Sequence, residues 1–109
     1  MPGGIKTDIR NYQLYINGEW TDSASKKTFP VYDPSTEEVI AQAPDAGPED
    51  VNRAVAAAKA AFDDGPWATT TAQERGRVLF RLANKIRENI PMLAEMEARN
   101  TGKPIVEAE

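Results

Sequence analysis

Apolar and polar residues alternate in the first half of the chain, which predicts two β-hairpins. The run 12–16 alternates and leads directly into Asn17-Gly18, the dipeptide that best supplies the two positive φ angles of a tight hairpin turn. Two further extended runs, 28–32 and 38–43, flank a segment rich in turn-forming residues at 33–36. The first half is therefore expected to form two antiparallel strand pairs.

Pro30 limits where the strand over 28–32 can lie. Proline has no backbone N–H, so it cannot donate a hydrogen bond to a neighbouring strand. The strand that contains Pro30 is therefore expected at an edge of its sheet, or with that position facing away from its partner.

From Pro48 onward the apolar residues recur with the period of a helix. Pro48 suits the first helical position, and the pair Glu49-Asp50 favours the positive end of a helix dipole. Apolar side chains then recur on one face at Val51, Ala54, Val55, Ala58 and Phe62. The segment 63–66 predicts the end of the helix, with Gly65 as a left-handed cap.

A second helix is predicted from Thr71, which forms a capping box with Glu74. Its apolar stripe comprises Leu79, Leu82, Ala83, Ile86 and Ile90. Pro91 interrupts this pattern and opens a third helix with Leu93 and Met96 on its inner face, which ends at Gly102 before Pro104. The residues at 105–109 look like the start of a further element.

Composition removes several classes of chemistry. The 109 residues include no cysteine and no histidine, and 13 Lys+Arg stand against 17 Asp+Glu, a net charge of -4. This excludes a thiolate nucleophile, an imidazole base, a disulfide and a zinc site of Cys/His type within the chain. The negative charge argues against nucleic acid or anionic lipid as a partner, and no apolar run is long enough to span a membrane. With no secretion signal at the start, the protein is expected to be cytoplasmic.

Three local patterns could carry chemistry, and each has a better structural interpretation. Gly102-Lys103 resembles the end of a phosphate-binding loop, but the required residues around it are missing, so a helix cap is expected. The acidic pairs Glu49-Asp50 and Asp63-Asp64 could share acid and base duties, but acids at helix ends are expected to be solvated caps. The threonines at 69–71 have no histidine to activate them. These residues therefore provide no catalytic or cofactor-binding group.

Five segments, taken in order, strongly resemble the amino-terminal portion of NAD(P)-dependent aldehyde dehydrogenases. They are Tyr15-Ile16-Asn17-Gly18-Glu19-Trp20, Thr28-Phe29-Pro30-Val31-Tyr32-Asp33-Pro34, Glu49-Asp50-Val51 with Arg53-Ala54-Val55, Glu74-Arg75-Gly76-Arg77, and Asn100-Thr101-Gly102-Lys103-Pro104. The resemblance covers about residues 12–109, and it is closest to the betaine-aldehyde and aminoaldehyde group.

This resemblance implies an α/β parent fold with a Rossmann-like cofactor domain. Residues 1–11 would be a flexible N-terminus, and 12–109 the truncated amino-terminal part of the NAD(P)-binding domain, made of two hairpins followed by amphipathic helices. The parent would be an oxidoreductase that converts an aldehyde to a carboxylic acid with NAD or NADP. The family's catalytic cysteine, glutamate and asparagine and its cofactor site all lie outside this sequence. The 109-residue fragment is therefore expected to be inactive alone.

The resemblance also implies a metal site. Some members of the betaine-aldehyde group hold a structural K⁺ or Na⁺ ion with main-chain carbonyls that match Val31 and Tyr32 and an acid that matches Asn100. An asparagine offers a carbonyl oxygen but lacks the charge, so the ion would be held more weakly. The alternative is that Asn100 is simply a residue near a helix end. Glu37 stands where the family commonly has glycine, which leaves the type of that turn open.

The sequence leaves two functions open. The chain is either part of an oxidoreductase, with the remainder of the dehydrogenase as its partner, or a stand-alone interaction module of the same fold. Extra alanines at positions 56, 57, 60 and 61 make the first helix apolar nearly all round, which is typical of a helix covered on more than one side. Without that cover, self-association into a homo-oligomer is expected.

Overall fold

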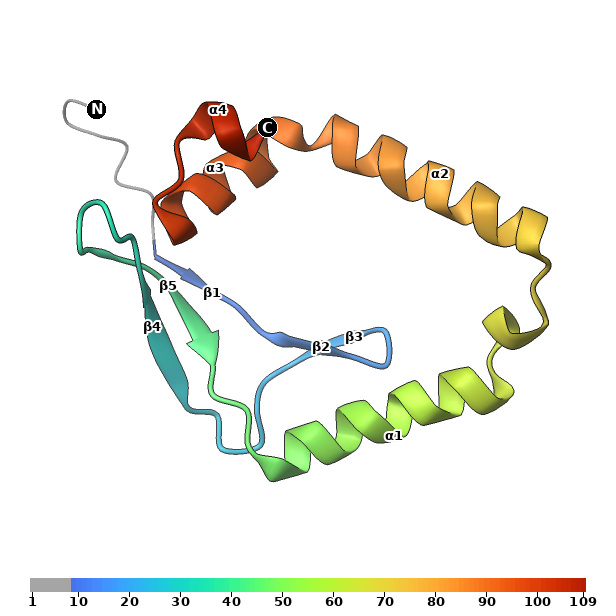
Figure 1. Ribbon diagram of the computed structural model, residues 1–109. Coiled ribbons are helices and arrows are strands. Elements are labelled where there is room, and N and C mark those ends of the chain that lie inside the picture. Colours follow the sequence, from blue (N-terminus) through green and yellow to red (C-terminus); the bar gives the residue numbers. More distant parts are fainter. Residues whose placement is uncertain (1–8) are drawn as a thin grey trace.

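The computed structural model describes residues 9–109, and Figure 1 shows their arrangement. The elements in chain order are β1 (Arg10–Asn11), β2 (Leu14–Ile16), β3 (Glu19–Thr21), β4 (Thr28–Tyr32), β5 (Val39–Pro44), α1 (Pro48–Asp64), the short 3-10 helix η1 (Pro66–Thr69), α2 (Ala72–Glu88), α3 (Ile90–Thr101) and α4 (Ile105–Ala108). None of the helices within residues 9–109 is long and apolar enough to cross a bilayer.

The first predicted hairpin is confirmed as β2 and β3. The antiparallel register pairs Ile16 with Glu19, which leaves Asn17 and Gly18 as a two-residue loop. Asn17 has a φ of 54° and Gly18 a φ of 78°. Two positive φ angles in a two-residue loop define the turn that matches the right-handed twist of the strands.

The second hairpin is also confirmed, within a three-stranded sheet of order β1-β5-β4. β4 lies at an edge, which explains why Pro30 is tolerated there.

The strand β1 was not predicted. It pairs in parallel with β5, with Arg10 opposite Ala41. Arg10 and Asn11 fall inside the segment 1–11 expected to be flexible, so ordered structure begins before residue 12; residues 1–8 lie outside the described part of the chain.

The turn between β4 and β5 contains a residue in the left-handed region. Glu37 has a φ of 62°, and its N–H donates to the Asp33 carbonyl at 2.7 Å. This is a conformation that glycine adopts without steric cost and a residue with a Cβ does not. Glu37 therefore adopts the left-handed backbone that glycine favours, at a cost in stability.

α1 begins at Pro48 as predicted, but its end differs from the prediction. Gly65 does not take the left-handed cap conformation: its φ is -76° and its ψ is 162°. Its N–H donates to the Ala61 carbonyl at 3.0 Å, and a Cβ on Gly65 would lie 2.3 Å from that same oxygen. Glycine is thus required here because the backbone at residue 65 lies too close to the Ala61 carbonyl for any side chain.

α2 and α3 follow the predicted signals with two differences. The Thr71 hydroxyl accepts from the Glu74 N–H at 3.2 Å, but the Glu74 carboxylate pairs with Arg77 instead of completing the capping box. α2 ends at Glu88, so Ile90 opens α3 rather than extending the α2 stripe. α3 then ends at Gly102, whose φ of 75° is the predicted left-handed cap.

The molecule is open, with little core of its own. Its radius of gyration is 17.7 Å, whereas a compact chain of this length would have about 13 Å. In Figure 1, α1 and α2 form two arms joined through η1, with the sheet on the opposite side. Among residues 9–109, Ala41 and Ala94 are the buried apolar residues. The apolar stripes of the helices are instead exposed.

Candidate functional site

A cavity lies between the three-stranded sheet and α3. Its volume is about 520 Å³. Its wall is mostly apolar, with charged groups from β1 and α3; the lining residues are Arg10, Tyr12, Val31, Ile40, Ala41, Met92, Leu93, Glu95, Met96, Glu97, Arg99 and Asn100. Leu93 and Met96, predicted for the inner face of α3, both line it. A cavity of this size accommodates a small ligand or side chains from another segment.

Two of the three residues named for a metal ion meet at this cavity. Val31 and Asn100 line it, whereas Tyr32 does not and is 54% exposed. The ladder between β4 and β5 is irregular at Val31 and Tyr32, as in a β-bulge, which disturbs the regular pairing of main-chain groups. Asn100 supplies an uncharged amide oxygen.

The carboxylates at this cavity do not form a metal site. Glu95 pairs with Arg99 at 3.4 Å and Glu97 with Lys103 at 3.5 Å, and no group of three or more Asp, Glu, His or Cys residues within 9–109 could hold an ion. The three-residue ion site stays a prediction.

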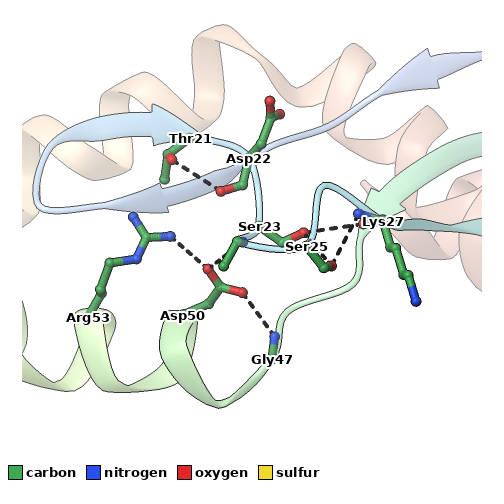
Figure 2. Close-up of polar contacts among 9 residues, drawn as sticks. Thr21, Asp22, Ser23, Ser25, Lys27, Gly47, Asp50 and Arg53 are labelled. Atoms are coloured by element: carbon green, nitrogen blue, oxygen red, sulfur yellow. Dashed lines mark hydrogen bonds and ion pairs between the residues drawn. The ribbon is translucent and has the colours of Figure 1, made fainter.

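A buried polar cluster surrounds Asp50 at the start of α1 (Figure 2). The carboxylate is 2% exposed. It accepts from the Gly47 N–H at 2.9 Å, from the Ala24 N–H at 3.0 Å and from the Arg53 guanidinium at 2.7 Å. The hydrogen bond from Gly47, followed by that from Arg53, lowers the pKa of Asp50 below its ordinary value of 3.8. The expectation that this acid is a solvated cap is therefore wrong, because it is buried and ionised.

The Asp50 cluster fixes a loop onto α1 and does not resemble a catalytic site. The Ser23 hydroxyl, 3% exposed as a residue, donates to the Lys27 carbonyl at 3.3 Å, and the Lys27 N–H donates to the Ser25 hydroxyl at 3.2 Å. Ala24, which lies between them, donates to Asp50. All of these groups are engaged with one another, so the cluster holds the loop between β3 and β4 against the N-terminus of α1.

The threonines at 69–71 serve structure, as expected. The hydroxyls of Thr69 and Thr70 donate to the Pro66 carbonyl at 3.3 Å and 2.7 Å, and Thr71 caps α2. The Arg75 guanidinium lies over the Trp67 ring, 5.3 Å from its centroid, and donates to the Trp67 carbonyl at 2.7 Å. This cation–π contact joins η1 to α2 and was not foreseen from sequence.

Comparison with known proteins identifies the fold to which these pieces belong. The sequence profile of the Aldehyde dehydrogenase family matches residues 20–109. The chain belongs to the aldehyde dehydrogenase family. It is 50% identical over 96 residues to the mitochondrial aldehyde dehydrogenase family 2 member B4 of Arabidopsis thaliana, covering 88% of this chain and 18% of that one. It is 48% identical over 96 residues to human aldehyde dehydrogenase 1A1, covering 87% and 19%.

Solved aldehyde dehydrogenases contain the same arrangement of strands and helices. The NAD⁺ complex of the Bacillus cereus enzyme matches with a TM-score of 0.86 and 42% identity, over 90% of this chain and 20% of that one. A betaine aldehyde dehydrogenase of Staphylococcus aureus matches with a TM-score of 0.85 and 40% identity, over 88% and 20%. The predicted α/β fold class is confirmed. The chain spans about a fifth of the length of the relatives it matches.

Proposed function

We propose that this chain is the amino-terminal part of the NAD(P)-binding domain of an enzyme that oxidises an aldehyde to a carboxylic acid with NAD⁺ or NADP⁺. The observation that carries the proposal is the family match over residues 20–109 together with the likeness to an aldehyde dehydrogenase solved with NAD⁺. The role of these residues is structural, since the described clusters hold elements together. Binding of the cofactor and chemistry belong to the remainder of the dehydrogenase, which is the proposed partner.

The chain alone is proposed to be inactive. It has no cysteine for a covalent thiol intermediate and no histidine to act as a base. The two carboxylates that line the cavity are already paired: Glu95 with Arg99 and Glu97 with Lys103.

A chimera tests this proposal. Residues 12–109 would replace the matching segment of the Bacillus cereus enzyme, and formation of NADH or NADPH from an aliphatic aldehyde would be followed by absorbance. The expected result is aldehyde-dependent turnover by the chimera and none by the purified 109-residue chain. Turnover by the isolated chain, after removal of contaminating enzyme by a second purification step, would refute the proposal.

The substrate class proposed is betaine aldehyde or an aminoaldehyde. Support comes from the likeness to a betaine aldehyde dehydrogenase of Staphylococcus aureus. The test is a comparison of kcat/KM for betaine aldehyde, an aminoaldehyde and a simple aliphatic aldehyde in a full-length enzyme that carries this segment. A clear preference for the aliphatic aldehyde would overturn this assignment without affecting the assignment to aldehyde oxidation.

A structural K⁺ or Na⁺ ion at Val31, Tyr32 and Asn100 is part of the proposal. The main-chain carbonyls of the two strand residues and the amide oxygen of Asn100 would hold it, and the ion would fix α3 against β4. In the chimera, Asn100→Asp restores a charged ligand, so we expect its thermal stability to rise more steeply with K⁺ concentration than that of the parent chimera. Asn100→Ala should abolish the K⁺ dependence. An unchanged K⁺ dependence in both variants would refute the proposed ion site.

The alternative is a stand-alone interaction module that forms a homo-oligomer. It is favoured by the exposed apolar residues of α1 and α2, among which Phe62 is 81% exposed and Leu79 59%. A stand-alone module would unfold cooperatively as a defined species, whereas a piece of a larger domain would not.

A cytoplasmic location is proposed for the enzyme. Its relatives include proteins named cytosolic and proteins named mitochondrial, so imaging of the tagged full-length protein tests this location.

A further inference from the structure

The tip of the β2–β3 hairpin combines an exposed asparagine with an unhindered glycine. Asn17 and Gly18 are both exposed. Apart from Gly18 and its two chain neighbours, no residue has a heavy atom within 4 Å of the position that a Cβ on Gly18 would occupy. Because the ladder pairs Ile16 with Glu19, the Gly18 N–H lies outside it. We propose that Asn17 is the preferred site of spontaneous deamidation in this chain.

The reaction uses only groups at this turn and solvent water. The Gly18 backbone nitrogen loses its proton to solvent base and attacks the Asn17 side-chain carbonyl carbon, Cγ. A nitrogen–carbon bond forms, ammonia leaves with a proton from solvent, and a five-membered succinimide results. Water then cleaves the ring at one of two carbonyls: cleavage at Cγ gives an ordinary aspartyl residue, and cleavage at the main-chain carbonyl gives an isoaspartyl linkage. No atom is oxidised or reduced.

Asn17 is distinguished from the other asparagines by the residue that follows it. A side chain on the following residue crowds the attacking nitrogen, and glycine has none. Five other asparagines are followed by larger residues: Asn11 by Tyr12, Asn52 by Arg53, Asn84 by Lys85, Asn89 by Ile90 and Asn100 by Thr101. Asn52, Asn84 and Asn100 also lie in α1, α2 and α3, where the helix fixes the backbone.

The product would place a new charge against an apolar surface. Asn17 and Gly18 line a cavity of about 390 Å³ between the hairpin and α1, together with Ala54, Ala57, Ala58 and Ala61. Deamidation makes the net charge of -4 one unit more negative and sets a carboxylate near these alanines, whose side chains cannot hydrogen-bond to it. The isoaspartyl form also adds one carbon to the backbone, which is incompatible with the two-residue loop.

The test is peptide mapping of the 109-residue chain after incubation at mildly alkaline pH. We expect a mass gain of about 1 Da on the peptide that contains Asn17 before any other asparagine peptide changes. Two products of that mass, the aspartyl and the isoaspartyl form, should separate by chromatography. The other five asparagines are internal controls. Asn17→Asp, which has no amide to lose at this position, is the control variant: its corresponding peptide should show no gain.

Either of two results would overturn the proposal. In one, a different asparagine is converted first, or all six are converted at the same pace. In the other, the aspartyl form appears without any isoaspartate, which would mean direct hydrolysis of the amide without a succinimide. A fold-specific readout accompanies the map, since the rings of Tyr15 and Trp20 lie 4.8 Å apart across the hairpin. The tryptophan fluorescence of the purified isoaspartyl form, to which Trp20 and Trp67 both contribute, should differ from that of the unmodified chain.

Discussion

Truncation of Leu82 should cost an assembled dehydrogenase much more stability than the exposure of Leu82 in this chain implies. Leu82 lies on the apolar stripe of α2 and is 54% exposed. If α2 is covered by the remainder of the enzyme, that exposed half becomes buried. The cost of Leu82→Ala in the assembled enzyme therefore measures whether such cover exists.

The expected magnitudes follow from the exposed fraction. Complete burial of a leucine side chain contributes about 1.5–3 kcal/mol. Slightly less than half of that burial exists without further cover, so Leu82→Ala would then cost roughly 1 kcal/mol. Truncation of a fully buried leucine also leaves a cavity and costs about 2–5 kcal/mol. Cover by the remainder of the enzyme should therefore add about 1–4 kcal/mol to the cost of Leu82→Ala.

The assay is urea denaturation followed by far-UV circular dichroism in the chimera with the Bacillus cereus enzyme. Phe80 is the matched control because it lies on α2 away from the stripe and is 74% exposed. Phe80→Ala should change the unfolding free energy of the chimera by about 0.5 kcal/mol or less. A cost of only about 1 kcal/mol for Leu82→Ala in the chimera would refute the argument that the α2 stripe is covered.

Three further predictions concern local stability in the chimera. Glu37→Gly should stabilise it by about 1 kcal/mol because the native φ is positive, whereas Glu37→Ala should not; urea denaturation checks both. Thr71→Ala should cost about 1 kcal/mol by removing the α2 cap, and Thr71→Ser should retain most of it. The lowered pKa of Asp50 means that its contribution to stability is complete above pH 3.8 and is lost as the pH falls through the lower folded value. Asp50→Asn should therefore be less stable at neutral pH and show a shallower loss of stability in acid; an acid limb as steep as that of the parent would contradict this.

Local signals in the sequence predicted most of the secondary structure. Three signals act as expected through the backbone angles that their residues prefer. Asn17-Gly18 forms the turn of the first hairpin, Pro48 begins α1 and Gly102 ends α3. Pro30 also placed its strand correctly, because a missing N–H excludes a central position.

Features that depend on distant segments were not predictable in the same way. β1 has two residues and pairs with β5. Two residues are too few to show the alternation of apolar and polar positions that predicts a strand. Asp50 is buried because Ala24, 26 positions earlier in the chain, donates to it. The prediction of a left-handed cap at Gly65 was wrong. Glycine is needed there because a Cβ would collide with the Ala61 carbonyl, and its φ is not positive.

The candidate ion site came from the family resemblance alone. The structure brings Val31 and Asn100 to one cavity from β4 and α3, a proximity that no local pattern in either segment encodes. Tyr32 is not part of that lining, since neighbouring side chains on a strand point to opposite faces. Its predicted role involves only its main-chain carbonyl.

All of these proposals depend on this chain being part of an aldehyde dehydrogenase whose remainder completes its core. The decisive experiment is light scattering coupled to size-exclusion chromatography on the purified 109-residue chain, together with thermal unfolding followed by circular dichroism. We expect self-associated species and a broad, non-cooperative transition, because the apolar faces of α1 and α2 lack their cover. A monomer or single defined oligomer with a sharp transition would contradict it and would favour the stand-alone interaction module.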